Sequence, residues 1–237
     1  MNKTGISWTD LTWNPVTGCS KVSPGCKHCY AEAWSHRWNR SFEVTLHPEK
    51  LKDVRKIPSG SKVFVNSMSD LFHEKVPMSF IWSVWDAIES RPDVIFQILT
   101  KRPERAGCWV IPENVWLGAS VELAQYKERI DHLRCARRAG MMIKRFVSFE
   151  PLLGDIGEVD FRLIDWIIIG GESGPHHRPM NIEWARNLIR QAKEQGVAVW
   201  MKQLGGLHPG GNLEDFPEDL RIREFPQMQI FEKREVE

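Results

Sequence analysis

The chain has 237 residues, enough to bury a large core, and barrels of alternating strands and helices reach this size as single domains. Its 32 basic and 31 acidic side chains nearly cancel, so the overall charge excludes a strong global attraction to nucleic acid or to an anionic membrane. No apolar run is long enough to cross a bilayer, and the polar start MNKTGISWTD lacks a signal-peptide core. We therefore expect a cytoplasmic protein.

The first distinctive segment is GCSKVSPGCKHCYAE, which carries Cys19, Cys26 and Cys29. Thiols stay reduced in the cytoplasm, so clustered cysteines there indicate metal binding or catalysis rather than a disulfide framework. The Ser, Pro and Gly residues between them favour turns that bring the thiolates to one metal centre. Three ligands on a four-coordinate metal leave one position open for chemistry. Cys108 and Cys135 lack a partner at ligand spacing and are predicted to be ordinary buried or half-exposed thiols.

Tryptophan is frequent, with eleven residues in the chain, and four of them flank the cysteines: Trp8, Trp13, Trp34 and Trp38. Two interpretations remain open. These rings fill the core, as large apolar side chains do, or they form the walls of a dry pocket beside a metal.

Short apolar runs rich in Val, Ile and Phe recur after the cysteines, and each ends in polar residues. Runs of this kind are typical of strands buried on both faces. We predict strands at 62–66, 94–99, 115–118, 145–149, 165–169 and 197–201, preceded by one strand before the cysteines. Helical periodicity predicts helices at 30–40, 77–90, 122–139 and 181–195. Residues 41–61 and 205–237 show little regular signal.

The alternation of strands and helices predicts an α/β fold with parallel strands and helices outside them. About seven strands fit this pattern. We predict one domain over residues 1–237: a (β/α) barrel of the TIM type, complete or partial, with an N-terminal three-cysteine cluster loop and an irregular tail over 205–237. The alternative is an open doubly wound sheet. In a barrel, the loops after the strands share one face, where active sites lie.

Polar residues follow every predicted strand and should meet at that face. They are Asn66, Ser67, Ser69, Asp70, Thr100, Lys101, Arg102, Ser120, Glu122, Ser148, Glu150, Gly170, Gly171, Glu172, Ser173, Lys202 and Gln203. A helix cap or a solvated loop explains any one of them. The set as a whole predicts a ligand site. The glycine pair of GGESG lets backbone approach a ligand closely and turns Glu172 into the mouth.

Two basic clusters are candidate anion sites: Lys101, Arg102 and Arg105 in TKRPER, and His176, His177 and Arg178 in HHRP. Arginine forks suit phosphate or carboxylate, so these clusters are candidate contacts for a nucleotide or nucleic acid. Ordinary surface basic residues are the alternative.

The metal is either Zn²⁺ or iron. Zn²⁺ held by the three thiolates and a fourth ligand such as His28 would make a closed structural site. That arrangement predicts a second Cys or His pair at zinc-finger spacing, and the sequence has none. Three thiolates holding three irons of a 4Fe–4S cluster need no fourth protein ligand, so the cluster is favoured.

A three-cysteine loop after a first strand, at the mouth of a predicted parallel barrel, resembles the radical S-adenosylmethionine enzymes. The spacing here is C-x6-C-x2-C, whereas C-x3-C-x2-C is the commonest in that superfamily, and GGESG comes later than the usual GGE motif. Over nearly the whole chain, SWTDLTWNPVTGC, the three cysteines, LTKRPER, SFEPLLG, GGESG and KQLGG are similar to a phage- and bacterium-borne family of unassigned function. Its members are often encoded beside a three-Cys-motif partner protein.

The superfamily resemblance implies that Cys19, Cys26 and Cys29 ligate a 4Fe–4S cluster and that S-adenosylmethionine binds its free iron. An electron from a one-electron reductant then releases a 5′-deoxyadenosyl radical, which takes hydrogen from the substrate. By position, the implied cofactor contacts are Asn66, Ser67, Ser120, Glu150, Gly170 and Gly171. The implied substrate contacts are Lys101, Arg102, Glu172 and Lys202.

No catalytic residue is assigned. The expected partners are the reductant, a nucleic-acid or nucleotide substrate and the protein encoded nearby, without a membrane. Two alternatives stay open. One is a non-catalytic zinc-stabilised binding module. The other is a metal-dependent hydrolase on the same barrel, which would draw on Asp70, Glu122, Glu150 and Glu172 but finds few histidines.

Overall fold

The computed structural model describes residues 2–137, 143–208 and 210–227. Its main feature is an eight-stranded sheet in the order β1-β2-β5-β6-β7-β8-β9-β10. The strands are β1 (Asn2–Lys3), β2 (Leu11–Trp13), β5 (Lys62–Val65), β6 (Ile95–Thr100), β7 (Val115–Ser120), β8 (Lys144–Phe149), β9 (Trp166–Gly170) and β10 (Ala198–Gln203). All neighbours from β2 onward pair in parallel, and β1 runs antiparallel to β2.

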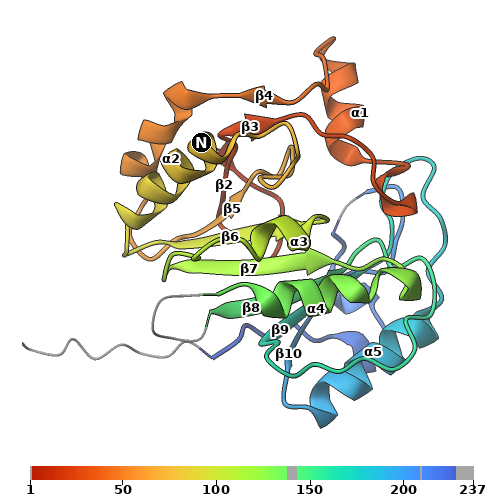
Figure 1. Cartoon of the computed structure of the whole chain (residues 1–237). Helices are drawn as coiled ribbons and strands as arrows, with labels where there is room; N and C mark the ends of the chain where they lie inside the picture. Colours follow the sequence, from red (N-terminus) through yellow and green to blue (C-terminus); the bar gives the residue numbers. More distant parts are fainter. Residues whose placement is uncertain (1, 138–142, 209, 228–237) are drawn as a thin grey trace, which may run out of the picture.

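The strand order follows the chain without a reversal, which distinguishes a barrel from a doubly wound sheet. The seven parallel strands curl into a half-barrel whose sheet ends at β1 and β10 (Figure 1). The prediction of a partial TIM-type barrel is therefore confirmed, whereas the complete barrel and the doubly wound sheet are wrong. Each of the six strands predicted after the cysteines is present.

The helices are α1 (Tyr30–Arg37), α2 (Met78–Glu89), α3 (Pro103–Ala106), α4 (Glu128–Cys135) and α5 (Ile182–Glu194). The single helix predicted at 122–139 is wrong. Leu123 is extended, and a 3-10 turn, η3 (Ala124–Tyr126), precedes α4. Ala136 then leaves the helix with extended backbone. Residues 138 and 139 lie outside the described part of the chain. None of the described helices is long and apolar enough to span a membrane.

Residues 41–61 contain more structure than their pattern indicates. β3 (Val16–Thr17) pairs antiparallel with β4 (Thr45–Leu46), and a 3-10 helix, η2 (Pro48–Lys56), follows. The predicted tail begins irregularly and then forms two 3-10 turns, η4 (Leu213–Asp215) and η5 (Glu218–Leu220). Past them, Arg223 makes an antiparallel bridge to Trp200, so the tail covers the β10 edge of the sheet. Residues 228–237 lie outside the described chain.

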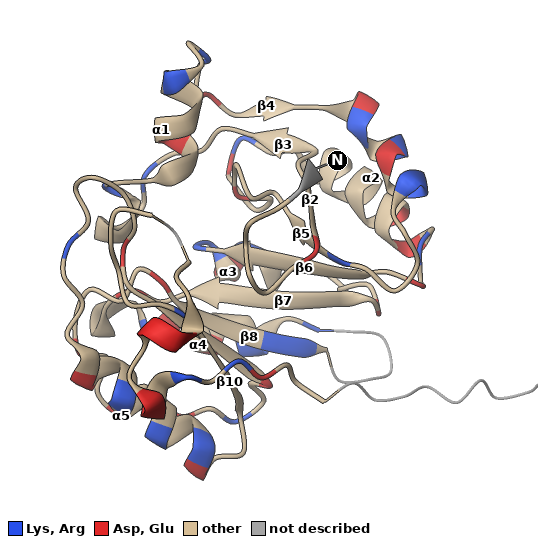
Figure 2. Ribbon diagram, turned by 180° about the vertical axis from the view of Figure 1, so that it is seen from behind, with Lys and Arg blue, Asp and Glu red and all other residues tan. Residues whose placement is uncertain are grey.

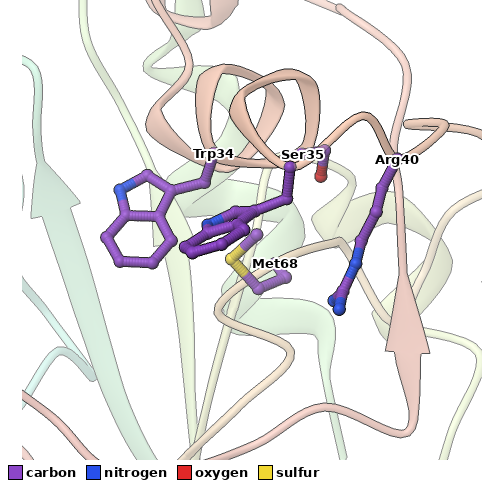
Figure 3. A pocket seen from close by; sticks show the side chains of 5 residues that line it. Trp34, Ser35, Arg40 and Met68 are labelled. Atoms are coloured by element: carbon purple, nitrogen blue, oxygen red, sulfur yellow. The ribbon is translucent and has the colours of Figure 1, made fainter.

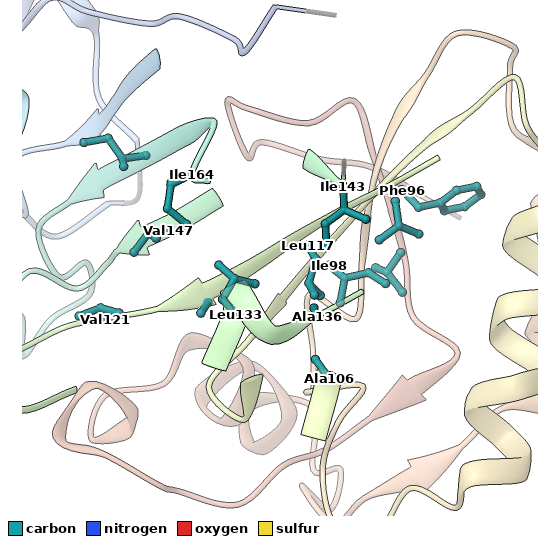
Figure 4. Packing of buried hydrophobic residues seen from close by; sticks show 14 of the residues in the cluster. Phe96, Ile98, Ala106, Leu117, Val121, Leu133, Ala136, Ile143, Val147 and Ile164 are labelled. Atoms are coloured by element: carbon teal, nitrogen blue, oxygen red, sulfur yellow. The ribbon is translucent and has the colours of Figure 1, made fainter. Parts of the chain in front are cut away.

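The core has two layers because successive side chains of a strand point to opposite faces of the sheet. One set packs against the helices: Figure 4 shows Ile98, Leu117 and Val147 beside Ala106 and Leu133. The other set, joined by Trp8 from the turn before β2, forms an apolar floor inside the curled sheet: Phe64, Trp116, Phe146, Trp166, Ile168 and Trp200. The rings of this floor meet in tilted and edge-to-face contacts, such as Trp116 against Trp166 at 5.9 Å between ring centroids. We call these seven residues the aromatic floor.

Only two of the four flanking tryptophans follow the core interpretation. Trp8 and Trp13 are buried, which confirms the core interpretation for them. Trp34 and Trp38 are exposed on and just after α1. Cys108 and Cys135 are both exposed, so the expectation that they are buried or half-exposed is wrong.

Candidate functional site

The sheet carries polar or small residues above the aromatic floor, toward the carboxyl ends of the strands. The two-residue period of a strand places Asn66, Ser148, Gly170 and Lys202 on the same face as the floor residues Phe64, Phe146, Ile168 and Trp200. Ser120 and Glu150 follow on the same face, one period further along their strands than Gly118 and Ser148. We call this set the polar rim. Four of the six predicted cofactor contacts lie in the rim: Asn66, Ser120, Glu150 and Gly170.

An ion pair crosses the rim. Lys202 of β10 donates from Nζ to the Glu150 carboxylate, which directly follows β8. Between these two strands lies β9, whose last residue is Gly170. A Cβ at Gly170 would stand 3.3 Å from Glu150 Cγ and 3.3 Å from Gln203 Cγ. The missing side chain therefore leaves room for the Glu150 carboxylate, the partner of Lys202, beside β9.

The end of β5 holds the chain that leads into the cysteines. Asn66 has a φ of +60°, a conformation that Asn adopts more readily than most residues. Its Oδ1 accepts a hydrogen bond from the Val16 amide at 3.1 Å. Its Nδ2 is buried and has no partner among the described residues. The next residue, Ser67, donates from its hydroxyl to Asn14 Oδ1 at 3.2 Å.

Cys19 begins the cysteine loop and lies against the strand-end residue Arg102. Gly18 makes the close approach before it, since a Cβ there would fall 2.1 Å from the Glu43 carbonyl oxygen. Arg102 Nη1 lies 3.7 Å from Cys19 Sγ. Burial raises the pKa of the Cys19 thiol to about 11, with a further increase from the Asp70 carboxylate, and Arg102 only partly opposes both effects. The thiol is therefore protonated at neutral pH, and a metal that bound here would have to displace the proton.

Asp70 joins the loops after β5 and β6. Its Oδ1 accepts from Thr100 Oγ1 at 2.7 Å, and its Oδ2 accepts from the Lys101 amide at 3.1 Å and from Arg102 Nη1 at 3.2 Å. Arg102 also donates from Nη2 to Ser20 Oγ at 2.9 Å. Arg102 is only 5% exposed, so this predicted substrate contact here braces the cysteine loop. Lys101 is half-buried, and its ammonium has no partner within the described chain.

The middle of the cysteine loop is fixed by Glu172, the acid of GGESG. Arg178 donates to it from Nε at 2.9 Å and from its own amide at 2.8 Å, and His28 Nδ1 lies 3.1 Å from Glu172 Oε2. Arg178 Nη2 also donates to the Pro24 carbonyl at 3.0 Å. Burial disfavours the Glu172 carboxylate, but the hydrogen bonds from Arg178 and His28 outweigh it and lower its pKa to about 2. Glu172 is therefore ionised and ties the loop to β9.

Glu122 lies against the cysteine loop at Gly25. It is fully buried, and its Oε2 accepts from Arg129 Nη1 at 2.9 Å. Its Oε1 is buried without a partner in the described residues. A Cβ at Gly25 would stand 2.9 Å from that oxygen. A side chain at position 25 would therefore force the Glu122 carboxylate to shift.

The glycines of GGESG serve a backbone contact. A Cβ at Gly171 would stand 2.4 Å from the Leu204 carbonyl oxygen of KQLGG. The two segments continue side by side, with the Gly206 amide donating to the Glu172 carbonyl at 3.1 Å. The close approach expected of this pair is therefore made here to KQLGG, and a role of Gly170 and Gly171 in cofactor binding stays a prediction. His176 faces His28, with ring centroids 6.1 Å apart, and His177 Nδ1 lies 2.8 Å from the Gly174 carbonyl.

Sequence reasoning missed two supports of the loop, Tyr30 and His73. The Tyr30 hydroxyl donates to the Ser67 carbonyl, which fastens the loop just after Cys29. The Lys75 amide donates to His73 Nδ1 at 3.1 Å, so Nε2 carries the proton and donates to Ser20 Oγ at 2.8 Å. The available signal was the polar cluster SMSDLFHE after a buried strand, which contains His73. Cys19 and His73 also line a cavity of about 320 Å³.

The three thiols fit a three-thiolate group by their chemistry. Cys19, Cys26 and Cys29 are free, partly exposed and carried by one loop. Within the described ranges, no group of three or more His, Cys, Asp or Glu side chains is disposed to hold a metal ion, so the sulfurs are not gathered at one point. The four strand-end carboxylates each face a cation instead: Asp70 with Arg102, Glu122 with Arg129, Glu150 with Lys202, and Glu172 with Arg178.

The solved structures similar to this chain include three of spore photoproduct lyase. The complex with dinucleoside spore photoproduct is 12% identical with a TM-score of 0.50, and a single-residue variant of the enzyme is 11% identical with a TM-score of 0.52. A second variant is 10% identical with a TM-score of 0.52. Each covers 81% of this chain, and this chain spans 63% of the length of each.

No curated protein matches the chain. The family model described as "Protein of unknown function (DUF5131)" matches residues 3–232, and the chain belongs to this family.

Proposed function

We propose that this protein is a radical S-adenosylmethionine enzyme whose 4Fe–4S cluster is held by Cys19, Cys26 and Cys29, and that its substrate is a nucleotide or nucleic acid. One observation carries the proposal. The three-cysteine loop lies on the loops that follow the parallel strands of a half-barrel, held there by Arg102, Glu172 and Tyr30. In parallel barrels this is the edge at which active sites are built.

The fold supports the superfamily. Spore photoproduct lyase is a radical S-adenosylmethionine enzyme, and one of its solved structures holds a dinucleoside photoproduct. The shared half-barrel makes the same class of chemistry a reasonable proposal for this chain, and a nucleotide substrate is compatible with it. Sequence identities of 10–12% support a common fold and do not identify the substrate.

The cluster would supply one-electron chemistry, the reductive cleavage of S-adenosylmethionine. This chain's own residues bind, orient and exclude water. The aromatic floor closes the inner face below the rim and keeps solvent out. Asn66, Ser67, Ser120, Glu150, Gly170 and Gly171 are proposed to hold the polar groups of S-adenosylmethionine. Asn66 suits this role because its Nδ2 is a buried donor without a partner in the described chain.

Lys101, Arg102, Glu172 and Lys202 are proposed to face the substrate. Of these, the Lys101 ammonium has no partner within the described chain, so it can bind an anionic group directly. The other three are already paired, with Asp70, Arg178 and Glu150. A substrate contact by any of them therefore requires an exchange of partners.

The two alternatives are less well supported. A hydrolase needs carboxylates free to bind metal, and each strand-end carboxylate here is engaged by an arginine or lysine. A zinc-stabilised module needs a fourth ligand. His28 is held by the ionised Glu172 and is not free to turn toward the cysteines without breaking that contact. We also propose that this protein works in the cytoplasm, receives its electron from a one-electron reductant and acts with the partner protein encoded nearby.

The test is anaerobic reconstitution followed by iron and sulfide analysis. We expect brown protein with about four irons per chain. Cys26→Ala should lose the iron, and the exposed-thiol control Cys135→Ala should retain it. Full iron retention by Cys26→Ala would contradict the ligand assignment, and one zinc without iron would favour the structural module.

A further inference from the structure

Two tryptophans beside the cysteine loop are left open to solvent. Trp34 is 58% exposed and Trp38 is 64% exposed. Across the described residues, neither ring stacks on another aromatic ring and neither indole N–H has a hydrogen-bond partner. Tryptophan has the largest apolar surface of the side chains, so two neighbouring exposed rings indicate a surface that a ligand covers.

These rings belong to one pocket. They are four residues apart, at the end of α1, and residues at this spacing share one face of a helix. Together with Ser35, Arg40 and Met68 they line a cavity of about 310 Å³, near the lower end of the range for small-ligand sites. Figure 3 shows Trp34 and Arg40 on opposite sides of this pocket, with Met68 between them. We call it the α1 pocket.

The charge around the pocket is positive and not neutralised. Arg37 and Arg40 are both exposed, and no ion pair to either is found in the described part of the chain. Glu32, the acidic residue in the first turn of α1, is already paired with Lys21 at 2.8 Å. Basic residues lie at the opposite end of α1 from this acidic turn (Figure 2). A flat aromatic face beside free guanidinium groups suits a base attached to phosphate.

We propose that the α1 pocket is a stacking site for an unpaired nucleobase of a single-stranded or locally opened nucleic acid, with Arg37 and Arg40 on the adjacent phosphates. The inference deepens the proposed function and rests on it for the reaction that follows binding. α1 starts directly after Cys29, and Trp34 is five residues further on, about 7.5 Å along the helix axis at 1.5 Å per residue. Met68 belongs to the loop whose Ser67 carbonyl binds Tyr30. A base in this pocket therefore lies beside the cysteine loop.

The experiment is fluorescence anisotropy with a fluorescein-labelled oligothymidylate of about 16 nucleotides, the upper end of typical single-strand sites. Full-length protein should bind it. Trp34→Ala and Trp38→Ala should each weaken binding about 5- to 150-fold, the range of one lost base stack. Trp82→Ala is the matched control because Trp82 is 55% exposed on α2, away from α1 in Figure 1, and its binding should equal that of the wild type. Arg40→Gln should lower the salt dependence of binding by about 0.7 in log–log slope.

Three results would overturn the proposal. One is wild-type affinity in Trp34→Ala and Trp38→Ala with unchanged circular dichroism. Another is equal binding of an abasic strand, which would make the surface a simple polyanion site. The third is self-association of the wild type, lost in both variants and independent of nucleic acid, which would make the surface a protein interface. Iron analysis of the same preparations separates the claims, because stacking without iron retention would contradict only the cluster, and iron retention without stacking would contradict only the α1 pocket.

Discussion

The aromatic floor and the polar rim occupy the same face of the same strands, yet their side chains differ in kind. Two residues along each strand, Phe64 is followed by Asn66, Phe146 by Ser148, Ile168 by Gly170 and Trp200 by Lys202. The floor residues are buried and pack on one another, whereas the rim carries an ion pair, small residues and an unsatisfied amide. This contrast matches other parallel barrels, in which one part of the strands supplies stability and the carboxyl ends carry the active site.

The largest effect on stability is expected from a substitution in the aromatic floor. Trp166 is fully buried and its ring contacts those of Trp8, Trp116, Phe146 and Trp200. Trp166→Ala should lower the free energy of unfolding by about 3–5 kcal/mol through the cavity it leaves. Urea unfolding measures this. The exposed control Trp82→Ala should cost about 0.5–1.5 kcal/mol, the value of its one aromatic contact. Equal losses in the two variants would contradict the role of the floor.

The next largest effect on stability is expected at Gly118, which lies where the aromatic floor meets the polar rim. Gly118 stands between Trp116 and Ser120 on β7, and a Cβ there would lie 2.5 Å from the Phe146 ring. Gly118→Ala should therefore cost about 1–3 kcal/mol by overpacking. Gly5→Ala is the control because nothing lies within 4 Å of its new methyl group, and it should stay within about 0.5 kcal/mol of wild type. A neutral Gly118→Ala would show that the floor yields easily.

A smaller effect on stability is expected at Glu172, which holds the cysteine loop through His28 and Arg178. Glu172→Gln exchanges charged hydrogen bonds for neutral ones and should cost about 1 kcal/mol, reduced further by the partial exposure of Arg178. The folded pKa of about 2 lies below the ordinary value of 4.5, so this contribution is complete above pH 4.5 and is lost as the pH falls toward 2. The difference between wild type and variant should follow that course in unfolding measured against pH. The exposed control Glu183→Gln should change stability by less than about 0.5 kcal/mol.

The smallest effect on stability, with a distinct effect on binding, is expected within the rim. The Ser120 hydroxyl makes no hydrogen bond to any described residue, so Ser120→Ala should change stability by less than about 1 kcal/mol. Affinity of iron-loaded protein for S-adenosylmethionine should fall about 2- to 10-fold, the value of one hydrogen bond. Equilibrium dialysis measures it. Unchanged affinity would remove Ser120 from the proposed contacts, and Ser83→Ala on α2 is the control.

The strands were predictable because parallel strands buried on both faces produce apolar runs such as VIFQIL, which β6 confirms with bounds shifted by one residue. The late start of α4 was not, because the helical pattern of the sequence continues through Leu123, which is extended, and through the 3-10 turn η3 that follows it. β3 and β4 have two residues each and carry no periodic signal.

The site was predictable as a set of polar strand ends but not as a set of pairs. Asp70 and Arg102 are 32 residues apart, and Glu150 and Lys202 are 52 apart. Their partnerships depend on which strands curl next to each other, which no local pattern reports. Two of the four residues expected to contact substrate, Arg102 and Glu172, contact the cysteine loop for this reason.

The most direct test of the central claim is whether the iron-loaded protein, mixed anaerobically with S-adenosylmethionine and a strong one-electron reductant, forms 5′-deoxyadenosine. The product is measured by chromatography and mass spectrometry, with Cys26→Ala and Cys135→Ala treated in parallel. We expect product from the wild type and Cys135→Ala and none from Cys26→Ala. Protein that carries a full complement of iron and forms no 5′-deoxyadenosine would contradict the assignment to the radical S-adenosylmethionine enzymes.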